Sequence, residues 1–174
     1  MSDFVMKILV FTEGTIIMHR GGIGHTRREI VRQVEEGEKT IHDWISYVPI
    51  GGAVAKLETW KNQGAEIVYL TSRTAADEVA SIESVLRKYE FPGRLLFCRE
   101  GEQYKDVAER VIPDVFVEDD CESIGGTDEM TISHVDPAIR GIIKSIIIKE
   151  FGGIDHLPDD VMALREKKEF DTAK

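Results

Sequence analysis

Polar side chains follow three short apolar runs of this chain, and their types suit the binding of a metal ion and an anion. The runs cover residues 8–11, 67–70 and 115–117. The polar residues after them are Thr12, Glu13, Gly14 and Thr15, then Thr71, Ser72 and Arg73, and lastly Glu118, Asp119 and Asp120. Clustered carboxylates repel one another unless a cation or a proton offsets their charge. Their oxygens are ligands of hard divalent ions such as Mg²⁺, and a phosphate can complete the shell. The simpler alternative is that these acids are solvated loop residues or helix caps.

The elements that would position these residues are parallel strands. A continuous apolar run that ends in a polar turn is typical of a strand buried on both faces. Two further runs, 95–97 and 145–148, have the same character, and stretches with helical spacing separate the runs. Strands that alternate with helices predict an α/β fold with a doubly wound, mostly parallel Rossmann-like sheet of about five strands. Ligands of such sheets bind outside the carboxyl ends of the strands, so the polar residues should meet at one edge.

Residues 18–48 do not continue this alternation. Thr26 and Glu29 have the spacing of a capping box, which predicts that a helix starts there. A second short helix is expected from Thr40. We therefore expect a single domain, 1–174, with a small helical insert at about 18–48 that lies over the sheet edge.

The stretch 11–15 resembles the first motif of the haloacid dehalogenase superfamily, in which Asp-x-Asp-Gly-Thr follows an apolar strand. Gly14 and Thr15 match this motif, and Glu13 replaces the second Asp. Phe11 stands where the motif has its nucleophilic Asp. Phe11 has no lone pair, so it cannot form the aspartyl-phosphate of that family's usual reaction.

The resemblance extends to three later motifs and covers roughly residues 6–17 and 49–125. Thr71 is similar to the Thr or Ser that binds the phosphoryl group, and Lys105 is similar to the lysine that neutralises phosphate charge. Glu118, Asp119 and Asp120 are similar to the acidic pair that holds Mg²⁺. The resemblance thus implies a haloacid-dehalogenase-like fold, Mg²⁺ as cofactor, and phosphate or a phosphorylated small molecule as ligand. The implied site has Glu13 and Lys105 as catalytic residues, Thr12, Gly14, Thr71, Ser72 and Arg73 as substrate-binding residues, and Glu13, Asp119 and Asp120 as metal ligands.

Three functions remain open at this point. The protein binds a phosphorylated compound without turnover, or it is a metal-dependent phosphohydrolase in which Glu13 acts as acid or base on a metal-bound water. The third alternative is a non-enzymatic interaction module. The sequence leaves open which of Glu118, Asp119 and Asp120 binds metal. It also leaves open the roles of Asp155 and His156.

The amino-acid composition restricts the classes of partner that this chain is expected to bind. The formal net charge of −10 over 174 residues argues against nucleic acid and against an anionic membrane surface, since both would repel the chain. Two cysteines are too few for a disulfide framework. The sequence shows no signal peptide and no apolar run of membrane-spanning length, so we expect a cytoplasmic protein. Self-association is left open. A basic island, whose role is also open, comprises Arg20, His25, Arg27 and Arg28.

Overall fold

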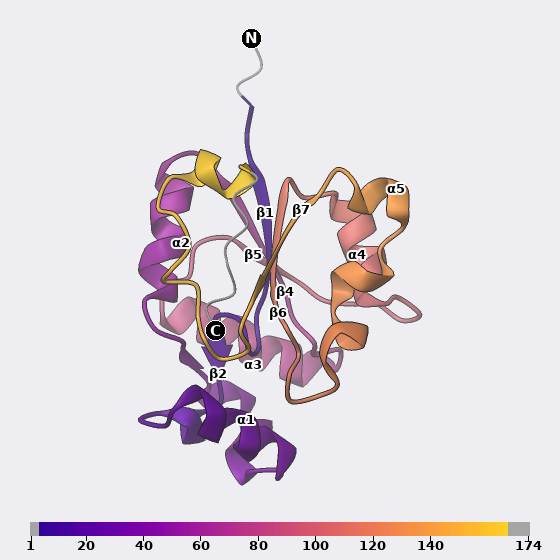
Figure 1. The fold of residues 1–174 in the computed structure, drawn as a ribbon. Helices are drawn as coiled ribbons and strands as arrows, with labels where there is room; N and C mark the ends of the chain where they lie inside the picture. The colour runs from indigo at the N-terminus through magenta and orange to yellow at the C-terminus, as the bar shows by residue number, and fades with distance from the viewer. Residues whose placement is uncertain (1–3, 167–174) are drawn as a thin grey trace.

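The fold is built on a five-stranded parallel sheet, seen in a computed structural model that describes residues 4–166. β1 (Lys7–Phe11) lies at the centre, between β4 (Glu66–Leu70) and β6 (Val115–Asp119). β5 (Arg94–Leu96) and β7 (Lys144–Ile148) form the two edges, and every pairing in this sheet is parallel (Figure 1). The predicted α/β fold class is confirmed.

Helices cover both faces of the sheet because successive side chains of each strand point to opposite faces. Ile8 and Val10 of β1 belong to one buried core and Leu9 to the other. α2 (Ala53–Asn62), α3 (Ala76–Lys88) and the 3-10 helix η6 (Val161–Arg165) contribute to the first core. α4 (Tyr104–Val111), α5 (Pro137–Arg140) and the 3-10 helix η5 (Thr131–His134) contribute to the second. A further 3-10 helix, η4, covers Gly126–Glu129.

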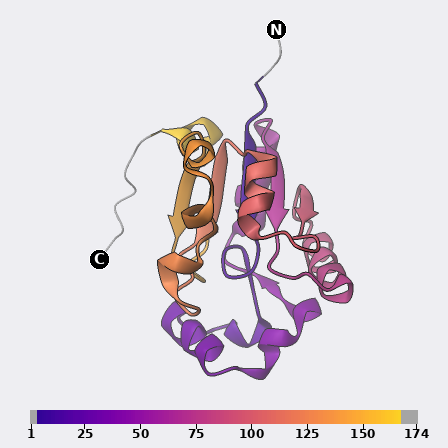
Figure 2. The same cartoon turned by 90° about the vertical axis from the view of Figure 1, so that its right-hand side faces the viewer.

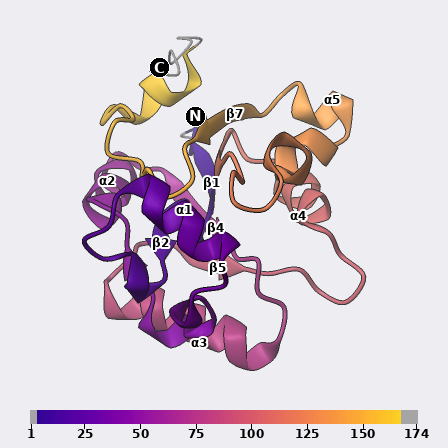
Figure 3. The ribbon, with the colours of Figure 1, turned by 60° about the horizontal axis from the view of Figure 1, so that its bottom comes forward.

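The segment between β1 and α2 lies across the carboxyl ends of the strands (Figures 2 and 3). It begins with β2 (Ile17–Met18) and ends with β3 (Val48–Pro49), which pair antiparallel in a two-stranded ribbon. Between these two strands lie η1 (Arg20–Gly22), α1 (Arg27–Glu35), η2 (Lys39–His42) and η3 (Trp44–Ser46). This segment, residues 17–49, therefore covers the edge of the sheet where ligands of parallel sheets bind.

Local details of this segment agree with the sequence at its start and differ later. The predicted capping box is present: the Thr26 backbone N–H donates to Glu29 Oε2 at 2.7 Å, and the Glu29 N–H donates to Thr26 Oγ1 at 3.3 Å. The second helix, expected from Thr40, is instead two 3-10 turns. Asp43, with φ −91° and ψ 65°, separates them because this backbone conformation is not helical.

At the carboxyl end, the sequence predicts a helical tail over residues 159–168, and the helix in the structure is shorter. The structure has one 3-10 helix there, η6, and residues 167 and 168 lie outside the described part of the chain. Among residues 4–166, no helix is both long enough and apolar enough to cross a bilayer.

Candidate functional site

A cavity of ≈ 250 Å³ lies between the strand ends and the segment above them. Phe11, Glu13 and Gly14 line it from the end of β1, and Ser72 and Arg73 from the end of β4. The opposite wall is largely apolar and aromatic, and the residues that segment 17–49 contributes to it are His19, Val34, Ile41, Trp44 and Tyr47. The cavity therefore stands where the topology predicts a ligand.

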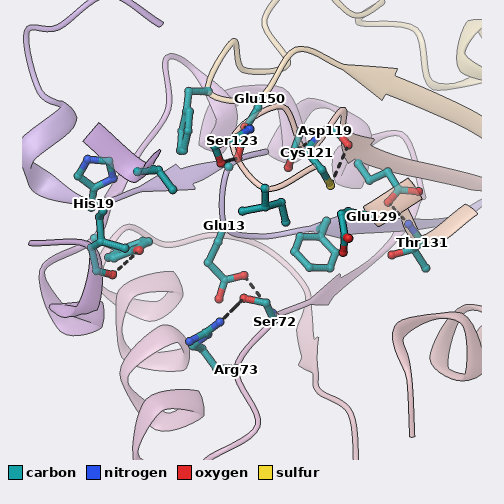
Figure 4. A pocket seen from close by; sticks show the side chains of 18 of the residues that line it. Glu13, His19, Ser72, Arg73, Asp119, Cys121, Ser123, Glu129, Thr131 and Glu150 are labelled. Atoms are coloured by element: carbon teal, nitrogen blue, oxygen red, sulfur yellow. Dashed lines mark hydrogen bonds between the residues drawn. The ribbon is translucent and has the colours of Figure 1, made fainter. Parts of the chain in front are cut away.

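The Glu13 carboxylate is held at the end of β4. Its Oε1 accepts a hydrogen bond from the Thr71 hydroxyl, and its Oε2 accepts from the Ser72 backbone N–H at 3.2 Å. The Thr12 hydroxyl also donates to Oε2. Thr12 and Thr71 are fully buried, so their hydroxyls depend on protein acceptors such as this one. Figure 4 shows the Glu13 side chain pointing toward Ser72 and Arg73 and away from Asp119 and Glu150.

A separate group of carboxylates lies at the ends of β6 and β7. Asp119, Asp120 and Glu150 each offer an oxygen, and these oxygens lie within 4.8 Å of one another. Asp119 is 4% exposed and Glu150 is 6% exposed. Burial raises the pKa of both carboxyl groups, and their acidic neighbours raise it further. Asp119 and Asp120 are two of the three predicted metal ligands, and the structure places them together. Glu13, the third predicted ligand, is not a member of this group.

Neighbouring donors hold these three carboxylates in place. Asp119 accepts from the Thr15 hydroxyl at 2.8 Å and from the Cys121 N–H at 2.9 Å. Glu150 accepts from the N–H and the hydroxyl of Ser123, both at 2.7 Å. Asp120 Oδ2 lies 3.3 Å from Lys149 Nζ. Three carboxylates with one exposed ammonium group leave net negative charge. An all-oxygen donor set of this kind fits Mg²⁺ or Ca²⁺ rather than a softer metal.

Glu118 lines the cavity, but its hydrogen bonds support the fold. Its two carboxylate oxygens accept from the backbone N–H groups of Thr131 and Ile132, at 2.7 and 2.9 Å. Burial raises the pKa of Glu118 to about 7, against the effect of these two hydrogen bonds. The side chain thus ties the start of η5 to β6.

An aromatic pair stands beside Glu13, where the resemblance would require a nucleophile. The ring of Phe11 packs edge to face on Tyr104, with centroids 5.4 Å apart. Lys105, the next residue, does not line this cavity; its Nζ lies 3.1 Å from Asp106 Oδ1. It lines a second hollow instead, of ≈ 490 Å³, together with Cys98 and His134. The structure therefore does not bring Lys105 to Glu13.

Arg73 connects the end of β4 to segment 17–49. Its guanidinium carbon lies 4.2 Å from the centroid of the Trp44 ring, a cation–π contact. Its Nη1 is 3.7 Å from Glu78 Oε2, and Trp44 Nε1 donates to Glu78 Oε1 at 3.1 Å. Ser72 Oγ accepts from Nε and Nη2 of Arg73 at 3.2 and 3.0 Å. These contacts fix the guanidinium at the cavity wall.

The basic island mostly meets acidic partners. Arg20 Nε lies 3.2 Å from Asp43, and His25 Nδ1 lies 3.5 Å from Glu29. Arg27 Nη1 is 2.5 Å from Glu122 Oε2 and donates to the Glu150 carbonyl at 3.4 Å. Arg27 thus attaches segment 17–49 to the loops after β6 and β7, while the pairs of Arg20 and His25 lie within this segment.

The Asp155 carboxylate, left open from the sequence, accepts from the Gly52 N–H at 2.9 and 3.0 Å at the start of α2. This contact gives Asp155 a structural role at the amino end of that helix.

Two residues of the site were not selected from the sequence. Glu150 follows the fifth apolar run, so the rule that strand ends collect ligands could have found it. Tyr104 precedes Lys105 in a helix that the sequence predicts over about 102–111, and no pattern marks Tyr104 as the residue that faces Phe11.

The parallel sheet with helices on both faces defines a Rossmann-like α/β fold, and solved phosphatase structures share this fold. A class C acid phosphatase from Bacillus anthracis, solved with tungstate bound, is 15% identical with a TM-score of 0.53; the match covers 98% of this chain and 76% of that chain. D,D-heptose 1,7-bisphosphate phosphatase from Burkholderia thailandensis is 11% identical with a TM-score of 0.41, over 84% of this chain and 93% of that one. A phosphoserine phosphatase in apo form is 11% identical with a TM-score of 0.44, over 84% and 94%. No protein-family model and no curated protein matches the sequence. At these identities the likeness shows the fold alone, and of these three structures the acid phosphatase has a TM-score above 0.5.

Proposed function

We propose that this protein binds a divalent cation, Mg²⁺, together with a phosphorylated small molecule, and that it does so without an aspartyl-phosphate step. The observation that carries the proposal is the convergence of Asp119, Asp120 and Glu150 beside the cavity at the strand ends. Their oxygens suit Mg²⁺, which would supply positive charge for a phosphate when bound.

The charge of the cavity supports a requirement for the cation. Its lining residues include five carboxylates, from Glu13, Glu118, Asp119, Glu129 and Glu150. Among the described lining residues, Arg73 is the only arginine or lysine. A phosphate that enters this cavity meets net negative charge, so a cation has to offset the repulsion before the phosphate is held.

The residues around Phe11 support binding rather than phosphoryl transfer. Phe11 and Tyr104 present rings where a nucleophile would be needed, and Lys105 lies in the other hollow. The Glu13 carboxylate is held by Thr71 and Ser72 and faces away from the acidic group, so we do not assign it as a base for metal-bound water. The acid phosphatase of the same fold was solved with tungstate, an oxyanion, and we extend oxyanion binding to this chain as part of the proposal.

Calorimetric titration with inorganic phosphate, with and without Mg²⁺, tests the proposal. We expect phosphate to bind the wild type only when Mg²⁺ is present, and to bind Asp119→Asn at least about tenfold more weakly. Glu122→Gln is the matched control, because Glu122 is a nearby carboxylate that pairs with Arg27 and does not line the cavity. Phosphate affinity that is equal with and without Mg²⁺, or equal in the wild type and Asp119→Asn, would overturn the proposal.

A further inference from the structure

Three hydrogen-bond donors converge on one anion at the ends of β1 and β4, and one of them, the Thr12 hydroxyl, also lies 3.3 Å from the Leu70 carbonyl oxygen. They are the hydroxyls of Thr12 and Thr71 and the backbone N–H of Ser72. The anion is the chain's own Glu13 carboxylate, and the donors are shared between its two oxygens. Hydrogen bonds from neutral donors to an ionised acceptor are among the stronger ones in proteins.

The Thr71 hydroxyl acts as a hydrogen-bond donor toward Glu13. Thr71 is fully buried, and its Oγ1 accepts a hydrogen bond from the Arg73 N–H at 3.1 Å. The hydroxyl proton is therefore left for a second partner, and that partner is Glu13. A buried donor in this position needs an acceptor, whether from the protein or from a ligand.

The same place is open to a ligand. Glu13, Ser72 and Arg73 all line the cavity, and Arg73 brings a guanidinium group to its wall. The contacts of Arg73 with Trp44, Glu78 and Ser72 keep that positive charge near the donors. Glu13 is only partly buried, so its carboxylate can turn away from the donors into the cavity.

We propose that Thr71, Ser72 and Thr12 form an oxyanion site that Glu13 fills as an internal anion. A phosphate or phosphate monoester then binds there only when the Glu13 carboxylate leaves. The inference rests on the proposed function for its ligand class, and adds that Glu13 competes with that ligand. The wild type therefore binds phosphate more weakly than a variant in which no carboxylate occupies these donors.

The test compares Glu13→Ala with Glu13→Gln by calorimetric titration with inorganic phosphate. Both variants remove the same charge, but the Gln amide oxygen can still accept from Thr71 or Ser72. We expect Glu13→Ala to bind phosphate about tenfold more tightly than the wild type, and Glu13→Gln to show a clearly smaller gain. Thr71→Val in the Glu13→Ala background should remove most of the gain.

Glu129→Ala is the matched control, because Glu129 is another carboxylate that lines this cavity and makes no contact with Thr71 or Ser72 among the hydrogen bonds of residues 4–166. It should change the affinity by no more than about threefold. Circular dichroism checks that each variant is folded, and Glu13→Ser serves as a second truncation with the same expected gain if Glu13→Ala unfolds.

Equal affinities for Glu13→Ala, Glu13→Gln and Glu129→Ala would overturn the inference, because charge alone would then explain any gain. If the wild type still required Mg²⁺ for phosphate in that case, the proposed function would stand. Conversely, a gain in Glu13→Ala that is independent of Mg²⁺ and unaffected by Asp119→Asn would support the inference and refute the metal-dependent function.

Discussion

The rings of Phe11 and Tyr104 pack edge to face, 5.4 Å between centroids and 84° between planes, at the carboxyl end of the central strand. The pair joins the core between the sheet and α4 to the cavity wall. Phe11 is also the residue that stands in place of the first Asp of the motif that the stretch 11–15 resembles. This contact is the reason that the function we propose includes no aspartyl-phosphate step, because a phenyl ring has no lone pair with which to attack a phosphate.

The first prediction is that Phe11→Asp does not create phosphatase activity. The new carboxylate would lack a lysine, because Lys105 pairs with Asp106 and lines the other hollow. Removal of the ring should lower the free energy of unfolding by about 2–4 kcal/mol, somewhat below the cost of deleting a fully buried Phe. Hydrolysis of p-nitrophenyl phosphate with Mg²⁺ and urea unfolding measure the two effects. Phe11→Leu, which keeps an apolar side chain, is the control and should lose less stability; clear hydrolysis by Phe11→Asp would show that the rest of the site is catalytically complete.

The second prediction concerns Glu118, whose carboxylate satisfies two buried N–H groups. Glu118→Ala leaves both donors without an acceptor, and we expect a loss of about 2–4 kcal/mol in the free energy of unfolding. Glu122→Ala is the control, because it removes only a partly exposed ion pair with Arg27 and should cost about 1 kcal/mol or less. Urea denaturation compares the two variants. Similar losses for both would mean that the bonds from Thr131 and Ile132 contribute little.

The third prediction separates backbone strain from crowding at the acidic group. Gly14 has φ +84°, and a methyl group there would lie 3.0 Å from Asp119 Oδ2 and 3.3 Å from Glu150 Cγ. Gly24 has φ +77° with nothing within 4 Å of such a methyl group. Both Gly→Ala variants should lose about 1–2 kcal/mol from the left-handed backbone. Only Gly14→Ala should also weaken Mg²⁺ binding, measured by calorimetry, because it pushes Asp119 and Glu150 apart; an equal Mg²⁺ affinity in both variants would contradict this.

The fourth prediction concerns the reactivity of Cys98, which is 5% exposed. Burial, with help from the nearby charges of Glu102 and Asp106, raises the pKa of its thiol from 9.0 to about 11. Because the thiolate is the reactive form and a raised pKa lowers its population below that pH, alkylation at pH 7.5 should be roughly 100-fold slower than for an exposed cysteine. The rate should keep rising with pH up to about 11. Iodoacetamide labelling of Cys121→Ser, which leaves Cys98 as the sole thiol, measures this; a rate that levels off near pH 9 would refute it.

The sequence predicted the parallel sheet because its strands are continuous apolar runs with polar ends. It also predicted which loops meet, since the carboxyl ends of parallel strands share one edge. It did not predict where the Glu13 carboxylate points, because that depends on three donors that come together only in the fold. It also did not predict that Lys105 faces away from Phe11. Neighbouring residues of a helix point about 100° apart, so the register of α4 decides whether Tyr104 or Lys105 meets Phe11.

We propose that Asp119, Asp120 and Glu150 hold the divalent ion and that Glu13 does not. Calorimetric titration of Mg²⁺ into the wild type, Glu150→Gln and Glu13→Gln tests it most directly, since both variants remove one cavity carboxylate. We predict that Glu150→Gln weakens Mg²⁺ binding by at least about tenfold, while Glu13→Gln changes it by no more than about threefold. Loss of Mg²⁺ binding in Glu13→Gln with wild-type affinity in Glu150→Gln would contradict the claim and place the ion beside Glu13.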